Sequence, residues 1–250
     1  MGNSCFIDAH CHLDDYENIE EIINNAIKAD VKIMIAQGTD FDSNRKVLEL
    51  ASEYPEIKAA LGLYPISALK LTDSKIEEEL HFIKKNKEKV FAIGEVGIDF
   101  KEDTDNHQRQ IEIFEKIILL SKEIDKTLII HSRKAEKEVI ELLKKHEVKK
   151  VIMHCFSGNF KLVKEISDKG WFLTIPTSVK NSEHFQKIIK EIDISKLLCE
   201  TDSPYLHPDK EWPNEPANVI ESYKKIAEIK GISLEEVKDK IFENYKLIFQ

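Results

Sequence analysis

The stretch Cys5-Phe-Ile-Asp-Ala-His-Cys-His12 is the most informative part of this sequence. Its apolar beginning predicts a β-strand, and side chains alternate between the two faces of a strand. His10 and His12 therefore point to the same side, about 7 Å apart along the chain. Two imidazoles side by side at a strand end can hold one divalent metal ion. A His-x-His pair alone is weak support, so its meaning depends on the rest of the chain.

Eight apolar runs recur along the chain and predict eight strands. They are Cys5–His10, Val31–Gly38, Lys58–Tyr64, Val90–Ile98, Thr127–His131, Val151–His154, Trp171–Pro176 and Leu197–Thr201. Most are continuously apolar rather than alternating, which is typical of strands buried on both faces of a parallel sheet. Stretches with helical periodicity separate them, and the segment Ser233-Leu-Glu-Glu236 predicts the capped start of a short terminal helix.

This alternation predicts an α/β protein, a (β/α)8 TIM barrel that forms a single domain over residues 1–250. The main alternative is a doubly wound open sheet. The absence of a Gly-x-Gly-x-x-Gly motif after the first strand argues against it.

Composition restricts the class of protein. The chain has 250 residues, 42% of them hydrophobic, and a net charge of −9, which argues against a broad basic surface for wrapping duplex DNA. A nucleic-acid end or a phosphate ester bound in a pocket stays compatible with that charge. No apolar run is long enough to cross a bilayer, and Met1-Gly2-Asn3-Ser4 leads directly into the first strand and leaves no room for a signal peptide. We therefore expect a cytoplasmic protein, and we expect no obligate protein partner. The four cysteines lack Cys-x-x-Cys spacing and are expected to be reduced.

Polar residues that suit a metal ion occur at the ends of five predicted strands. They are His10 and His12, Glu95, His131, His154 and Asp202. Because all strand C-termini of a barrel open onto one face, we expect these side chains to meet there. Imidazole and carboxylate are ligands of Zn²⁺ and similar ions. Each residue alone has an ordinary structural explanation, but their joint placement on one rim predicts a metal site.

Together these segments resemble the TatD-type deoxyribonuclease family, metal-dependent hydrolases of the amidohydrolase superfamily. The resemblance runs the length of the chain, and its motifs are highly specific when taken in this order. The segments are Asp8-Ala-His-Cys-His-Leu-Asp14, Gly94-Glu-Val-Gly-Ile-Asp99, His131-Ser-Arg133, His154-Cys-Phe-Ser-Gly158, Glu200-Thr-Asp-Ser-Pro-Tyr-Leu206, Asn214-Glu-Pro216 and the ending Asn244 through Phe249.

The resemblance implies a centre of two divalent metal ions. His10, His12 and Asp202 would hold one ion, and His131 and His154 would hold the other. Glu95 would bridge both ions, and Asp202 would also transfer a proton, so these two carboxylates are the expected catalytic residues. The ions could be Zn²⁺, Mn²⁺ or Mg²⁺, and the histidine-rich set favours the first two.

Arg133, Tyr64 and Ser203 are the expected substrate contacts. The resemblance places Arg133 at a substrate phosphate. Tyr64 stands where many family members have the histidine of Gly-x-His-Pro, and its phenol could donate a hydrogen bond to phosphate or stack on a base. A second departure is Pro213, where the family often has a basic residue. Both differences leave the metal ligands intact and concern the identity of the substrate.

Three functions follow. The leading hypothesis is a metal-dependent deoxyribonuclease that cleaves phosphodiester bonds, exonuclease-like, at exposed or single-stranded ends. The second keeps the site and changes the bond to an ester or amide, as in a D-aminoacyl-tRNA deacylase. The third is a catalytically silent barrel in which the metal only stabilises the fold, and the complete ligand set argues against it.

Overall fold

Eight parallel strands form one continuous sheet in the computed structural model, which describes residues 4–249. The start Met1–Asn3, part of the segment from which we expected no signal peptide, lies outside the described residues. The strands are β1 (Phe6–Cys11), β2 (Val31–Gln37), β3 (Ile57–Leu61), β4 (Ala92–Asp99), β5 (Leu128–Arg133), β6 (Val151–Met153), β7 (Phe172–Pro176) and β8 (Leu197–Glu200), and they follow one another around the sheet in chain order.

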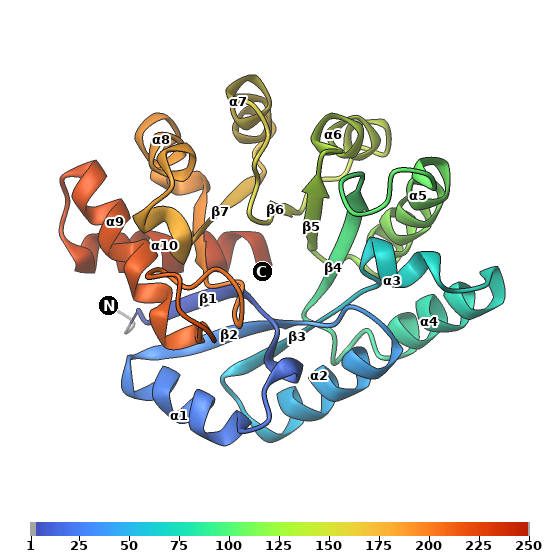
Figure 1. Ribbon diagram of the computed structural model, residues 1–250, viewed down its shortest axis with the longest axis horizontal. Coiled ribbons are helices and arrows are strands. Elements are labelled where there is room, and N and C mark those ends of the chain that lie inside the picture. The colour runs from blue at the N-terminus through green and yellow to red at the C-terminus, as the bar shows by residue number, and fades with distance from the viewer. Residues whose placement is uncertain (1–3, 250) are drawn as a thin grey trace.

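Helices surround the strands as an outer layer, which gives the predicted (β/α)8 barrel (Figure 1). They are α1 (Ile19–Lys28), α2 (Phe41–Glu53), α3 (Pro65–Leu69), α4 (Asp73–Lys85), α5 (His107–Ile124), α6 (Glu136–Lys145), α7 (Phe160–Asp168), α8 (Glu183–Glu191), α9 (Ile220–Lys230) and α10 (Leu234–Phe249). Short 3-10 turns cover Leu13–Asp15, Thr177–Lys180, Ile194–Lys196 and Pro216–Val219. None of the helices within residues 4–249 is long and apolar enough to span a membrane.

The barrel closes between β1 and β8 just beyond the end of β8. There the Asp202 amide donates to the His10 carbonyl at 2.9 Å, and the His12 amide donates to the Ser203 carbonyl at 2.7 Å. Cys11 and Ser203 form the corresponding parallel bridge. The backbone bonds that complete the barrel therefore lie directly beside three of the predicted metal ligands.

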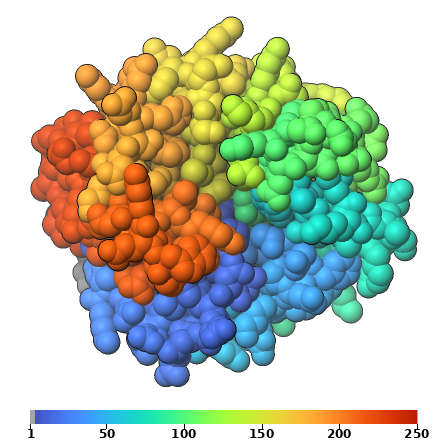
Figure 2. Space-filling model, in the orientation of Figure 1, coloured from blue at the N-terminus to red at the C-terminus, as the bar shows by residue number. Residues whose placement is uncertain are grey.

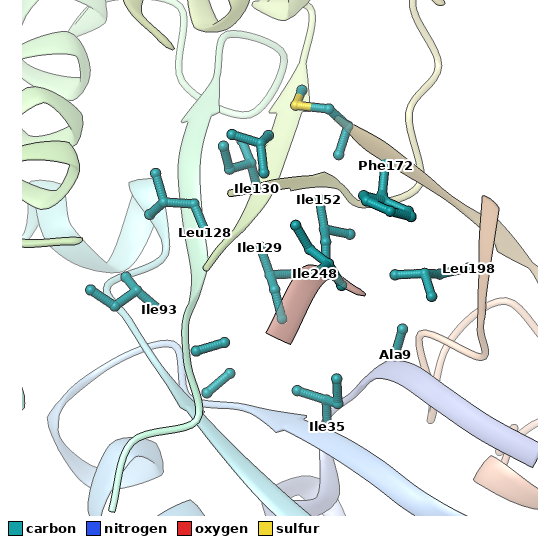
Figure 3. Packing of buried hydrophobic residues seen from close by; sticks show 14 of the residues in the cluster. Ala9, Ile35, Ile93, Leu128, Ile129, Ile130, Ile152, Phe172, Leu198 and Ile248 are labelled. Atoms are coloured by element: carbon teal, nitrogen blue, oxygen red, sulfur yellow. The ribbon is translucent and has the colours of Figure 1, made fainter. Parts of the chain in front are cut away.

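The interior of the barrel is packed with branched apolar side chains. Figure 3 shows Ile129, Ile152 and Ile248 within the ring of strands, and all three are buried. Ile248 comes from α10, which closes the barrel at the N-terminal ends of the strands. Thr127, just before β5, donates a hydrogen bond to the Ile248 carbonyl at 2.9 Å, and Asn244 donates to the Leu197 carbonyl at 2.7 Å. With this end closed, the opposite, C-terminal end is left for a site.

The predicted and observed elements differ mainly at their ends. β3 ends at Leu61 rather than Tyr64, and Pro65 opens the additional short helix α3. The terminal helix was expected to be short, but α10 has 16 residues. Its predicted start is confirmed, because the amide and hydroxyl of Ser233 both donate to the Glu236 carboxylate. The extra length of α10 provides the turn that carries Ile248 into the barrel.

Candidate metal centre

The structure brings all six predicted metal ligands to the C-terminal face of the barrel. His10 lies near the end of β1 and His12 directly follows the strand, Glu95 lies within β4, and His131 lies within β5. His154 and Asp202 come just after β6 and β8. Their donor atoms form two groups, one of His10, His12 and Asp202 and one of Glu95, His131 and His154, and within each group these atoms lie within 4.8 Å of one another.

Glu95 belongs to the second group but turns one of its carboxylate oxygens toward the histidines of the first. Its Oε2 lies 3.5 Å from Nε2 of His12 and 3.8 Å from Nε2 of His10. Its Oε1 lies 3.0 Å from Nδ1 of His131 and 3.6 Å from Nε2 of His154. The carboxylate thus has the placement that a bridging ligand between two ions requires.

The spacing of the first group fits a metal ion better than it fits direct hydrogen bonds. Oδ1 of Asp202 lies 3.5 Å from Nε2 of both His10 and His12, and the two Nε2 atoms are 3.2 Å apart. Four ligands at about 2.0–2.2 Å from a tetrahedral ion are themselves separated by about 3.3–3.6 Å. Three nitrogen or oxygen atoms that converge at this distance in a buried site match the donor chemistry of a divalent ion.

Two further carboxylates, which are not among the predicted site residues, hold His131 and His154. Glu200 Oε2 lies 3.0 Å from Nδ1 of His154, and Asp99 Oδ2 lies 2.9 Å from Nε2 of His131. In each case the other ring nitrogen faces Glu95. A carboxylate that accepts a hydrogen bond from one ring nitrogen keeps the proton there and leaves the other nitrogen free for a metal. Both residues lie inside motifs already quoted, Gly94–Asp99 and Glu200–Leu206, which is the signal that could have identified them.

The charges of the centre shift the pKa values of its groups in opposite directions. Burial alone would raise the pKa of Glu95, but the hydrogen bond from His131 and the neighbouring imidazoles hold it well below its usual range. Burial opposes the charged form of His12, yet the neighbouring carboxylates of Asp202 and Glu95 raise its pKa to about 9. Burial and the nearby His154 lower the pKa of His10. The carboxylates therefore favour a cation in this space.

Gly97 allows β4 and β5 to approach closely beside the centre. Its φ is +141°, a conformation that L side chains rarely adopt, and a Cβ at this position would lie 1.9 Å from the His131 carbonyl oxygen. A glycine is therefore required here for sterics as well as for backbone conformation. Its presence brings His131 of β5 to the same rim as Glu95 of β4.

A cavity of about 450 Å³ opens above the centre. Two of the three expected substrate contacts line it, Arg133 and Tyr64. Arg133 Nε donates to Asp99 Oδ2 at 2.8 Å, its Nη2 lies 3.0 Å from Glu102 Oε2, and the Tyr64 hydroxyl donates to Asp99 Oδ2 at 3.1 Å. The lining residues are His12, Asp14, Asp15, Thr39, Tyr64, Ser67, Glu95, Glu102, His131, Arg133, His154, Asp202 and Tyr205.

Ser203, the third expected substrate contact, is not brought to this cavity. It has no exposed surface, and its hydroxyl is buried without a hydrogen-bond partner among the described residues. Its backbone carbonyl instead joins β8 to β1 through the amide of His12. Ser203 is kept from the cavity because its backbone takes part in the closure of the barrel. Its side chain is therefore buried, whereas the side chain of the preceding residue, Asp202, faces the centre.

Comparison with known proteins places this geometry in context. The family model described as TatD related DNase matches residues 7–250. An uncharacterized metal-dependent hydrolase of Methanocaldococcus jannaschii is 39% identical over 98% of this chain and 96% of its own length. The human deoxyribonuclease TATDN3 is 32% identical over 97% of this chain and 94% of its own length. The crystal structure of the TatD homologue YJJV from Escherichia coli K12 superposes with a TM-score of 0.92 at 26% identity, covering 98% of this chain and 97% of that one.

Proposed function

This chain belongs to the TatD-related DNase family and is a metal-dependent hydrolase, and on that premise we propose that it cleaves phosphodiester bonds of DNA at exposed or single-stranded ends. The observation that carries the proposal is the carboxylate of Glu95, which faces His10 and His12 with one oxygen and His131 and His154 with the other. This arrangement supports two divalent ions side by side, held by the six predicted ligands. Two such ions, when bound, activate a water molecule for attack and polarise a phosphoryl oxygen.

Asp202 is the proposed proton carrier. Its Oδ1 faces both His10 and His12 at 3.5 Å, and its side chain lines the cavity where substrate would lie. A carboxylate at the border between the ligand set and the cavity can take a proton from an attacking water and return it to the leaving oxygen. Glu95, which is almost wholly buried, keeps the charge that holds the centre together.

Arg133 and Tyr64 are the proposed contacts of the phosphate. Both side chains line the cavity, and both donate to the same oxygen of Asp99. Asp99 therefore positions the two donors beside His131, on one side of the centre. A guanidinium held in this way presents its remaining N–H groups to an anion.

A second candidate function is hydrolysis of an ester or amide that carries an ammonium group, such as a D-aminoacyl-tRNA. The observation that favours it is the charge of the cavity. Asp14, Asp15 and Glu102 line it beside the ligands, and Arg133 is the only lysine or arginine among the described residues of its wall. Carboxylates on the rim suit a cationic group better than a chain of phosphates.

The two candidates are separated by one set of assays. The purified protein is analysed for bound metal, stripped, and restored with Zn²⁺, Mn²⁺ or Mg²⁺. Each form is then given 3′-end-labelled single-stranded DNA and a D-aminoacyl-tRNA. We expect ion-dependent shortening of the DNA, lost in His131→Ala and retained in His146→Ala, whose imidazole is partly buried against Glu115 at the end of α6. Hydrolysis of the aminoacyl ester alone would reject the deoxyribonuclease and favour the second candidate.

A further inference from the structure

Two exposed aromatic side chains lie together beside the metal-centre cavity. Tyr205 and Trp212 are 46% and 69% exposed, and no other phenylalanine, tyrosine or tryptophan within residues 4–249 is as exposed. Their ring centroids are 5.6 Å apart. Both belong to the loop between β8 and α9, which lies at the front of the molecule, in orange, next to the N-terminal segment in blue (Figure 2).

The aromatic pair lies at the edge of the metal-centre cavity. Tyr205 lines the cavity above the ligands, and its ring centroid is 6.0 Å from that of His12. Tyr205 also lines a neighbouring cavity of about 570 Å³, together with Trp212. The wall of this second cavity consists of Asp15, Tyr16, Glu17, Pro204, Tyr205, Trp212 and Pro213. A substrate held at the metal centre therefore meets Tyr205 first and Trp212 next.

Hydrogen bonds from neighbouring side chains fix the backbone of the loop that carries the two rings. Asn214 is fully buried, and its side-chain amide donates to the carbonyls of Tyr205 at 2.7 Å and Thr201 at 3.0 Å. Thr177 donates to the carbonyl of Leu206 at 2.7 Å. The Tyr16 hydroxyl donates to the Asn214 carbonyl. Rings on a pinned loop bind a flat partner with little loss of conformational freedom.

The chemistry of this surface points to a neutral ring rather than to phosphate. No lysine or arginine occurs among the described residues that line the second cavity, and two of them, Asp15 and Glu17, are acidic. The rings are tilted by 56° to each other, so a flat ligand stacks on one of them at a time. The indole of Trp212 is the larger and more exposed of the two faces.

We propose that Trp212, flanked by Tyr205, is a stacking site for an unpaired nucleobase of the substrate strand next to the cleaved phosphodiester. This inference rests on the proposed function and names the substrate as single-stranded nucleic acid recognised through a base. Stacking on an aromatic side chain tolerates any base, because every base has a flat π-face. A double-stranded end would need to separate its terminal pair before a base could reach the indole.

A binding experiment tests the site without hydrolysis. The chain has two tryptophans, and Trp171 is buried at the opposite end of the barrel, where its indole donates to the Val148 carbonyl. Titration with deoxyadenosine 5′-monophosphate is expected to quench tryptophan fluorescence in the wild-type protein and not in Trp212→Phe, which retains only Trp171. Deoxyribose 5-phosphate, which has the same charge and no base, is expected to leave the fluorescence unchanged. Equal quenching by the two compounds would overturn the proposal, because it would show recognition of phosphate.

A kinetic experiment tests the role of stacking in turnover. Single-stranded oligodeoxyadenylates are compared with versions that carry an abasic analogue at either position flanking the cleaved bond. We expect the wild-type kcat/KM to fall by about 5- to 150-fold for one of the abasic positions. Trp212→Phe should keep this preference, and Trp212→Leu, which is apolar but not flat, should lose it. Leu119→Ala, an exposed residue on α5, serves as the control.

The outcomes separate this inference from the proposed function. Cleavage of DNA with equal rates for base-bearing and abasic strands, or an unchanged preference in Trp212→Leu, would overturn the stacking site and leave the deoxyribonuclease intact. If no oligonucleotide is cleaved with any ion, the proposed function fails. The fluorescence titration then decides the stacking site by itself, and an absence of quenching overturns it.

Discussion

The Arg133 guanidinium donates a hydrogen bond to the Asp99 carboxylate at 2.8 Å, directly across the register of β4 and β5. Asp99 Oδ2 also accepts a hydrogen bond from the Tyr64 hydroxyl and lies 2.9 Å from Nε2 of His131. One carboxylate oxygen thus connects both proposed phosphate contacts with a proposed metal ligand. Asp99 therefore couples the substrate side of the centre to the metal side. Substitutions on the two sides can be told apart by measuring both turnover and metal binding.

Arg133→Ala is expected to leave the metal content unchanged and to lower phosphodiester turnover by one or more orders of magnitude. A charge-assisted contact in a closed site contributes about 2–4 kcal/mol to the transition state. Arg133→Lys should restore only part of the activity, because an ammonium group lacks the planar fork of the guanidinium. The measurements are metal analysis and kcat/KM on single-stranded DNA. Unchanged turnover in the metal-replete variant would argue against a phosphate role and for an ester or amide substrate.

Glu102→Gln should have the opposite effect on substrate binding. Glu102 lies 3.0 Å from the Arg133 guanidinium and is about half exposed, so it competes with an incoming phosphate for the same N–H groups. Removal of its charge is expected to lower KM for DNA by about 1.5- to 5-fold, the range for an exposed ion pair. Glu138→Gln on α6 is a matched change outside the cavity. An increase of KM in Glu102→Gln would show that this carboxylate helps to bind substrate.

Asp99→Asn and Glu200→Gln are expected to weaken metal binding by about 10–100-fold, although neither residue is a proposed ligand. Each removes the carboxylate that orients one histidine, His131 or His154. Competition with a chelating dye measures the affinity. Glu79→Gln is the control, because Glu79 is a buried carboxylate that accepts bonds from Asn44 and Arg45 away from the centre. It should lower stability and leave metal affinity unchanged, and equal losses in all three variants would point to a general loss of folding.

The fold could be predicted from the sequence because its signals are local. Continuous apolar runs such as Val151–Met153 mark strands buried on both sides, and the polar residues at their ends mark the open face of the barrel. The ends of elements were less predictable. Tyr64 follows Leu63 without any polar break, so the run predicts a strand up to Tyr64, whereas Pro65 begins α3. The N-terminal closure by α10 depends on a long-range contact of Ile248 that no local pattern records.

The residues of the site likewise fall into those that local sequence could place and those that it could not. Residues whose role follows from their own strand, such as His10 and His12, could be placed by alternation alone. Roles that depend on a neighbouring strand could not. Glu136 is the carboxylate nearest to Arg133 on its C-terminal side in the sequence, yet the β4–β5 register places Asp99 opposite Arg133. The inward turn of Ser203 likewise follows from the bridge between β1 and β8.

Removal of the metal is expected to lower thermal stability. Without ions, the carboxylates of Glu95 and Asp202 are offset by the imidazoles of His10 and His12 rather than by a divalent charge. An ion that binds only the folded protein stabilises it by about 2.7 kcal/mol at a concentration 100 times its dissociation constant. The unfolding temperature should therefore rise when Zn²⁺ or Mn²⁺ is returned to the stripped protein. The gain should shrink at pH 5, because protons compete with the ion for the imidazoles. A gain independent of pH would argue against histidine ligands.

Glu95→Gln is the most demanding test of the two-ion centre. The amide is nearly the same size as the carboxylate, so the space between His12 and His131 stays filled and the barrel should fold normally. It has no charge and only one oxygen, whereas the carboxylate presents Oε2 to His12 and Oε1 to His131. We therefore expect the variant to lose at least one ion and nearly all activity, almost as severely as Glu95→Ala. The ratio of metal to protein, measured after dialysis against trace ion, gives the direct answer. A Glu95→Gln protein that keeps two ions and full turnover would show that Glu95 is not the bridge, and the ligand assignment of both groups would then have to change.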